Sequence, residues 1–138
     1  MAESIKVPSR PDETLAAVRE MSGENVHKCM QCGQCAGLCP MFSTGKLDAS
    51  PRRVLHLLQA GMLAQVLGLV TPWTCASCYD CEARCPRGVD LPRVMEAIRQ
   101  LALRHGESRL DPIHPFPAAV LAEAPQLAMV AAFRKLTP

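Results

Sequence analysis

The stretch from Cys29 to Pro40 reads CMQCGQCAGLCP, and the stretch from Cys75 to Pro86 reads CASCYDCEARCP. Both have the form C-x2-C-x2-C-x3-C-P, and each cysteine and proline of the second stretch lies 46 residues after its counterpart in the first. Together they hold all eight cysteines of the 138-residue chain. The chain therefore contains an internal repeat whose unit is four thiols followed by a proline.

The repeated run is typical of iron–sulfur proteins. The same spacing occurs in bacterial ferredoxins with two clusters, in which the fourth cysteine of each run binds the cluster of the other run. Three cysteines at intervals of three can wrap a loop around one cubane, and the proline after the fourth turns the chain away. Gly33 and Gly37 allow the backbone to approach a cluster and offer N–H groups to its sulfur atoms.

We therefore predict two [4Fe–4S] clusters with crossed ligation. One cluster is expected to be bound by Cys29, Cys32, Cys35 and Cys85. The other is expected to be bound by Cys75, Cys78, Cys81 and Cys39. Structural zinc fits this cysteine pattern less well, because zinc prefers two separated C-x2-C pairs with four ligands per ion. Disulfides fit less well still, because they are rare in a reducing cytoplasm.

Composition and charge narrow the class of protein. The chain is 49% apolar, and only five residues are aromatic, so we expect a bound group to organise its centre. The formal net charge is only +2, and the lysines and arginines are scattered along the chain, so these features do not indicate a nucleic-acid-binding protein. Eight thiolates on two oxidised cores would bring that charge to about −2. The sequence has no catalytic triad, phosphate loop or flavin fingerprint, so we expect a non-catalytic subunit.

The start of the chain has no pattern typical of secretion. Residues 1–12 contain four charged residues and no apolar run, so the expected location is the cytoplasm. Residues 54–79 contain no formal charge, but polar residues and two glycines interrupt the run. A spanning helix needs about 20 apolar residues. We therefore expect buried helices there and no direct membrane span.

Helical patterns occupy the remaining sequence. Ser50 and Pro51 predict the start of a helix over residues 52–60, and Gly61 predicts its end. Further helices are expected over residues 12–21, over residues 62–69, and from Leu91 to a stop at Gly106 with Asp90 as the cap. Residues 41–49 are expected to form a loop, and no strand pattern is visible.

Crossed ligation and these helices together predict the fold. Cys39 and Cys75 must reach one cluster although 35 residues separate them, so the chain must turn back, as it can at Gly61. We predict an all-α protein, an alpha-helical ferredoxin with two cluster-binding loops. The expected domains are residues 1–21, an extension with a short helix; 22–106, the two-cluster ferredoxin; and 107–138, a proline-rich connector and apolar tail.

Four stretches of the chain resemble the small, C-type iron–sulfur subunit of heterodisulfide reductases. They are SGENVHKCMQCGQCAGLCP, SPRRVLHLLQAG, WTCASCYDCEARCPRGVDLP and the helix ending at Gly106, and they span residues 22–106. The cysteine runs alone also occur in the iron–sulfur subunits of succinate dehydrogenases and glycolate oxidases. The second stretch and the W-x-C-x-x-C-Y-x-C-E-x-R-C-P-R-G-V run are more specific to heterodisulfide reductases.

This resemblance implies electron transfer within a hetero-oligomeric oxidoreductase. The C-type subunit is expected to relay electrons between a flavin-containing A-type subunit and a B-type subunit that reduces a disulfide. The alternative is an iron–sulfur subunit of a membrane-anchored quinone oxidoreductase of the succinate dehydrogenase type. A zinc-stabilised binding module is a third and weaker alternative.

Partners are expected to dock beside the clusters. The residues expected to be exposed there are Met30, Gln31 and Gln34 in one loop and Ala76, Ser77 and Asp80 in the other.

Trp73 and Tyr79 are expected to shield a cluster by packing. Five arginines are consistent with either of two roles. Either they offset the negative charge of the clusters, or they are ordinary residues of solvent-exposed helix faces. They are Arg52, Arg53, Arg84, Arg87 and Arg93. The apolar residues of the tail, from Leu121 to Leu136, fit either core packing or docking on a partner.

Overall fold

The computed structural model describes residues 11–104, 118–123, 125–127 and 130–131. Within these ranges the regular structure is helical and includes no strand, which confirms the predicted all-α class. The chain divides into two compact units, Met1–Arg99 and Gln100–Pro138. The domain boundary predicted at Gly106 lies outside the described residues. Both cysteine runs belong to the first unit.

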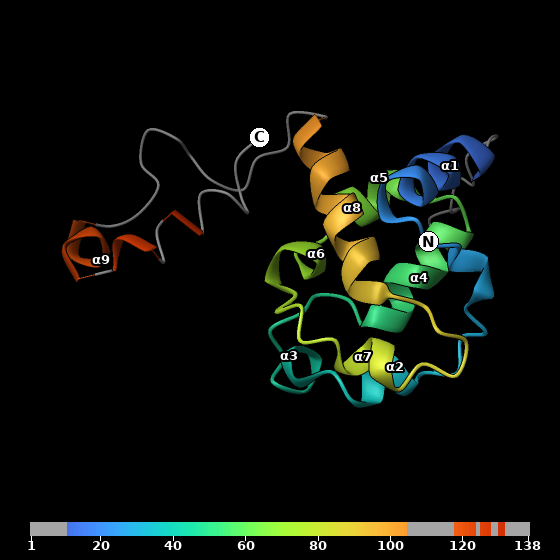
Figure 1. The fold of residues 1–138 in the computed structure, drawn as a ribbon, viewed down its shortest axis with the longest axis horizontal. Coiled ribbons are helices and arrows are strands. Elements are labelled where there is room, and N and C mark those ends of the chain that lie inside the picture. Colours follow the sequence, from blue (N-terminus) through green and yellow to red (C-terminus); the bar gives the residue numbers. More distant parts are fainter. Residues whose placement is uncertain (1–10, 105–117, 124, 128–129, 132–138) are drawn as a thin grey trace, which may run out of the picture. The chain divides into compact units, whose positions relative to one another are not determined.

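Short helices build the first unit (Figure 1). In chain order they are α1 (Pro11–Ser22), the 3-10 helix η1 (Val26–Lys28), α2 (Gln34–Gly37), α3 (Pro40–Ser43), α4 (Pro51–Gln59), α5 (Leu63–Leu67), α6 (Thr71–Thr74), α7 (Asp80–Ala83) and α8 (Leu91–Arg104). Helix α8 continues past the boundary between the two units. Helix α9 (Ala118–Glu123) belongs to the second unit.

Side-chain caps fix the starts of the two helices that carry most of the core. Ser50 Oγ accepts the Arg53 N–H at 3.2 Å, and Pro51 follows in the first turn, where a missing N–H costs nothing. Asp90 Oδ1 accepts the Arg93 N–H at 3.0 Å at the start of α8. Gly61 follows α4 with a φ of 71°, a left-handed conformation that ends helices. These sequence predictions are confirmed.

Helix α4 organises the first unit. It contacts α1, η1, α2 and α5. Its buried side chains include Val54, Leu55, Leu57 and Leu58, and those of α8 include Leu91, Val94, Met95 and Ile98. Burial of each such side chain contributes about 1.5–3 kcal/mol. Aliphatic side chains therefore supply most of this core, and no cysteine is among the buried residues.

Some of the short helices were not predicted from the sequence. Among them, α3 lies partly within residues 41–49, which were expected to form a loop, and α6 precedes the second cysteine run. Each of these two has four residues and a proline in its first turn, and four residues are too few to show helical periodicity. The helices predicted over 12–21 and 62–69 are confirmed as α1 and α5, with shifted ends. None of the helices in the described part of the chain combines the length and the hydropathy of a membrane-spanning segment.

Candidate metal centre

The two cysteine loops share one backbone conformation. Gln31 and Gly33 in the first loop have φ values of 59° and 86°, and Ser77 and Tyr79 in the second have 52° and 64°. These pairs are related by the same 46-residue offset as the cysteines, so the sequence repeat is also a structural repeat. A non-glycine residue in this left-handed region costs about 1–3 kcal/mol, and such strain is concentrated at functional sites.

A one-turn helix follows the second left-handed residue of each loop and carries the third cysteine of the run. Cys35 lies in α2 and Cys81 lies in α7. The two helices are in contact, at the same end of the first unit (Figure 1). This packing brings the two cysteine runs together although they are 46 residues apart in the sequence.

One cavity gathers three cysteines of the first run and the last cysteine of the second. Its wall includes Cys29, Cys32, Cys35 and Cys85. Cys81, Arg52 and Arg87 also line it. Arg87 Nε donates to the carbonyl of Lys28 at 3.2 Å. This hydrogen bond joins the segment that follows Cys85 to the segment that precedes Cys29.

A second cavity gathers the complementary set. Its wall includes Cys39, Cys75, Cys78 and Cys81. Most of the remaining wall is apolar and includes Met41, Leu47, Pro51, Leu91 and Met95. Cys81 and Leu91 lie on the walls of both cavities, so the two cavities are adjacent.

The thiols are close enough to influence one another. Cys32 and Cys78 are exposed, and the other six cysteines are half-buried. Burial, followed by the charges of Cys29 and Cys32, raises the pKa of the Cys35 thiol to about 11. Burial, followed by the charges of Cys75, Cys35 and Cys78, raises the pKa of the Cys81 thiol to about 12. Neighbouring thiolates repel one another, and a cationic group bound between them offsets this repulsion.

This donor set fits iron–sulfur clusters. The two cavities are lined by all eight cysteines, with Cys81 shared between them, and eight is the number of thiolates that two [4Fe–4S] clusters require. Among the described residues, no three His, Cys, Asp or Glu side chains converge closely enough to hold a single metal ion. A cubane does not require such convergence, because each of its four thiolates binds a different iron atom.

Hydrogen bonds reach the sulfur atoms of Cys29 and Cys85. Gln31 donates to Cys29 Sγ from its backbone N–H at 3.4 Å and from its side-chain amide at 3.6 Å. The Val89 N–H donates to Cys85 Sγ at 3.4 Å. Both sulfur atoms belong to the first cavity, which therefore receives donors from the first cysteine run and from the segment that follows the second.

Asp48 fixes the start of α6, just before the second cysteine run. Its carboxylate oxygens accept the N–H groups of Val70 and Thr71 at 2.8 and 2.9 Å. Thr71 Oγ1 donates to the same carboxylate at 2.6 Å. Burial alone would raise the pKa of Asp48, but the hydrogen bonds from Thr71 and Val70 outweigh it and hold the pKa below its usual value of 3.8.

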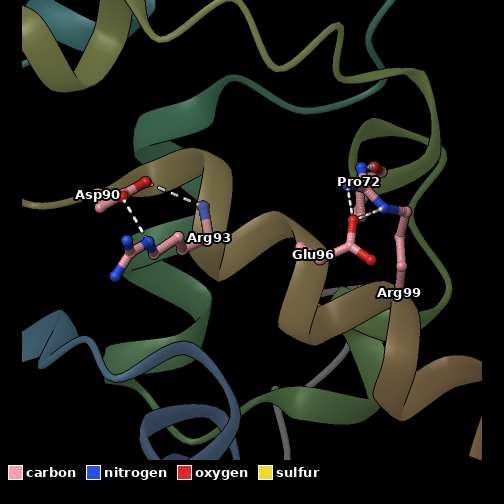
Figure 2. Close-up of polar contacts among 5 residues, drawn as sticks. All are labelled: Pro72, Asp90, Arg93, Glu96 and Arg99. Carbon is pink, nitrogen blue, oxygen red and sulfur yellow. Dashed lines mark hydrogen bonds and ion pairs between the residues drawn. The ribbon is translucent and has the colours of Figure 1, made fainter.

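A buried arginine of α8 holds the same short helix from another side. Arg99 Nη1 donates to the carbonyl of Pro72 at 2.6 Å, and its guanidinium pairs with Glu96 (Figure 2). Arg93, nearer the start of α8, pairs instead with Asp90 in an exposed position. Helix α6 is thus fixed by residues from two distant parts of the chain.

Comparison with known proteins identifies the family. Residues 25–89, which contain both cysteine runs, match the 4Fe-4S dicluster domain. The C-type iron-sulfur subunit of the CoB–CoM heterodisulfide reductase of Methanopyrus kandleri is 38% identical over 82 residues, 59% of this chain and 42% of that protein. Its counterpart in the ferredoxin:CoB-CoM heterodisulfide reductase of Methanosarcina mazei is 36% identical over 97 residues, 70% of this chain and 58% of that protein. The chain belongs to the family of C-type heterodisulfide reductase subunits.

A third member of this family shows the same relationship. The C-type subunit of the ferredoxin/F(420)H(2)-dependent CoB-CoM heterodisulfide reductase of Methanosarcina acetivorans is 32% identical over 111 residues, 80% of this chain and 66% of that protein. The chain spans about half the length of the first curated relatives it matches. The resemblance to the C-type subunit and the iron–sulfur character predicted from the sequence are confirmed.

The structure shows how exposed the other residues singled out from the sequence are. All five arginines are exposed, and two of them, Arg52 and Arg87, also line the first cavity. Met30, Gln34, Ala76 and Asp80 are exposed as expected. Gln31 and Ser77 were also expected to be exposed, but they are half-buried. Trp73 is buried, but Tyr79 is 48% exposed and therefore a poor shield.

One site residue was missed. Gln59 reaches the first cysteine loop from the end of α4 and hydrogen-bonds to Gln31. No local sequence pattern indicated this contact, because a glutamine near a helix end resembles an ordinary solvated residue.

Proposed function

We propose that this chain is an electron-transfer subunit that relays electrons through two [4Fe–4S] clusters with crossed ligation. The first cluster would be held by Cys29, Cys32, Cys35 and Cys85. The second would be held by Cys75, Cys78, Cys81 and Cys39. The observation that carries the proposal is the lining of the two cavities. The second cavity combines three cysteines of the second run with Cys39, and the first combines three cysteines of the first run with Cys85 and with Cys81, which the two cavities share.

The adjacency of the cavities supports a relay. Cys81 lies on both walls, and α2 and α7 are in contact. Bound clusters supply one-electron exchange, and the chain holds them close together in a fixed arrangement. The half-buried cysteines and the exposed loop residues Met30 and Asp80 leave each cluster accessible from outside. Electrons can then enter at one cluster and leave from the other.

The family relationship supports the nature of the partners. We propose a hetero-oligomeric complex in the cytoplasm, in which this protein lies between a flavin-containing A-type subunit and a B-type subunit that reduces a disulfide. The two cysteine loops provide separate faces for these partners, because each contains its own small or uncharged exposed residues, such as Gln34 and Ala76.

Iron and sulfide analysis tests the cofactor content. The protein purified without oxygen should contain about eight iron atoms and about eight acid-labile sulfides per chain. Stoichiometric zinc with little iron would contradict the proposal.

Paired substitutions test the crossed ligation. Cys29→Ser and Cys85→Ser should perturb the same electron paramagnetic resonance (EPR) signal of the reduced protein, because both residues are expected to bind one cluster. Cys75→Ser and Cys39→Ser should both perturb the other signal. If Cys39→Ser instead alters the signal that Cys29→Ser alters, each run binds its own cluster and the crossed assignment is wrong.

A further inference from the structure

A chain of hydrogen bonds joins helix α4 to a cysteine of the first cavity. Gln59, the last residue of α4, donates from Nε2 to the carbonyls of Val26 and Cys29, each at 2.9 Å. Gln59 Oε1 accepts from Gln31 Nε2 at 2.9 Å. Gln31 Nε2 also donates to Cys29 Sγ at 3.6 Å. The side chain of Gln31 therefore lies between a core helix and the sulfur atom.

The number of available donors fixes the orientation of both amides. Gln59 Nε2 has two N–H groups, and the two carbonyls use both of them. Turning this amide over would place Oε1 against two carbonyl oxygens, which are also acceptors. Oε1 must therefore face Gln31, and Gln31 must present its own NH2 group. One of those N–H groups binds Gln59 and the other is available to Cys29 Sγ.

We propose that Gln31, oriented by Gln59, is a positioning residue that raises the reduction potential of the cluster bound through Cys29. The inference rests on the proposed function, since it requires a cluster on that sulfur. A reduced cluster carries one more negative charge than an oxidised one. An N–H group directed at a ligand sulfur stabilises the added charge and favours reduction.

The backbone of Gln31 supports this role. Its φ of 59° is unfavourable for a non-glycine residue, and it allows the backbone N–H to donate to Cys29 Sγ as well, at 3.4 Å. The corresponding residue of the second loop, Ser77, has a similar φ but a much shorter side chain. The second cluster is therefore an internal reference for any substitution at Gln31.

Hyperfine spectroscopy tests the contact in the unsubstituted protein. The chain is prepared with glutamine labelled with ¹⁵N only at the side-chain amide, and the clusters are reduced. We expect a ¹⁵N coupling to one of the two clusters, and this coupling should be lost in Gln31→Met, which has a similar size but no donor. A loaded and reduced protein with no such coupling overturns the inference, whatever the behaviour of the variants.

Redox titration followed by EPR tests the consequence. Gln31→Met should shift the potential of the cluster bound through Cys29 downward and leave the other unchanged. Gln59→Met should shift the same cluster in the same direction, and the double variant should shift it no further than Gln31→Met alone. Gln65→Met, the same change at an exposed position of α5, is the control and should shift neither cluster.

The outcomes separate this inference from the proposed function. If the unsubstituted protein lacks iron and sulfide, the proposed function fails first. If both clusters are present but Gln31→Met leaves both potentials unchanged, or shifts both equally, the tuning role of Gln31 is wrong while the electron-transfer role stands.

Discussion

At the scale of single residues, the site depends on a few side chains and backbone angles that hold the cysteine loops. Gln31, Ser77 and Tyr79 all adopt positive φ, at positions repeated between the loops. Only Gly33 among the four left-handed loop positions is a glycine. Three of these loop residues therefore adopt backbone conformations that are unfavourable for them. The packing of α2 against α7 and the ligation of clusters can both stabilise these conformations.

Asp48 provides the first prediction at this scale. Asp48→Asn should destabilise the protein by about 1 kcal/mol at neutral pH, because a neutral amide replaces a carboxylate that accepts three hydrogen bonds at the start of α6. Urea unfolding of the loaded protein under anaerobic conditions measures the difference. Ser43→Ala, which removes an exposed local hydrogen bond, should change stability by less.

The contribution of Asp48 also has a defined pH dependence. The pKa of Asp48 is lower in the folded than in the unfolded chain, so its contribution is complete above the usual value of 3.8 and is lost as the pH falls through the lower, folded pKa. The stability gap between the wild type and Asp48→Asn should therefore be constant from neutral pH to about pH 5 and narrow below it. A gap that widens on acidification would contradict the assigned cause.

At the scale of helices, two arginines of α8 have similar partners but different surroundings. The side chain of Arg99 is 4% exposed and donates to Pro72, whereas that of Arg93 is 65% exposed and pairs only with Asp90 among the described contacts (Figure 2). Arg99 therefore links α8 to α6, and Arg93 acts only within its own first turn.

Arg99→Met should destabilise the protein by about 1–3 kcal/mol, because it leaves the Pro72 carbonyl without its donor in a buried position. Arg93→Met is the matched control and should cost no more than about 1 kcal/mol, since the Arg93 side chain is 65% exposed and ion pairs of surface arginines contribute little. Denaturant unfolding measures both. Equal effects of the two substitutions would show that the link to α6 is unimportant.

At the scale of the whole molecule, the aliphatic core and the cysteine cavities are distinct. The buried side chains of α4 and α8 form the core, whereas all eight cysteines are at least partly exposed. Removal of the clusters by a chelator should therefore loosen residues 29–39 and 75–89 more than α4 or α8. Hydrogen exchange of the loaded and cluster-free forms measures this. Uniform loss of protection would show instead that the clusters hold the entire unit together.

The tail provides the second prediction at this scale. Leu127 and Val130 are 81% and 54% exposed, and Met129, Phe133 and Leu136 lie outside the described residues. We expect a chain lacking residues 118–138 to keep both clusters but to lose its partner subunits during purification. Iron content and co-purification from the native host are the measurements. If clusters and partners are lost together, the tail belongs to the core.

The sequence by itself determined the chemistry and the fold class. The spacing of Cys29 to Pro40, repeated at Cys75 to Pro86, predicts iron–sulfur chemistry because cluster ligation needs several thiols within one short loop. Ser50, Asp90 and Gly61 predict helix ends because caps act through hydrogen bonds and φ preferences between near neighbours. Such local interactions can be read directly from the order of residues.

Only the tertiary structure decided which distant residues meet. Gln59 reaches Gln31 and Arg99 reaches Pro72 across 28 and 27 residues, and neither contact has a local signature. The cysteine repeat already predicted that Cys85 would join Cys29 and that Cys39 would join Cys75, and packing of helices far apart in the chain places each pair on one cavity wall. The physical reason is that these contacts depend on the directions in which α4, α7 and α8 project their side chains, and packing of the complete core fixes those directions.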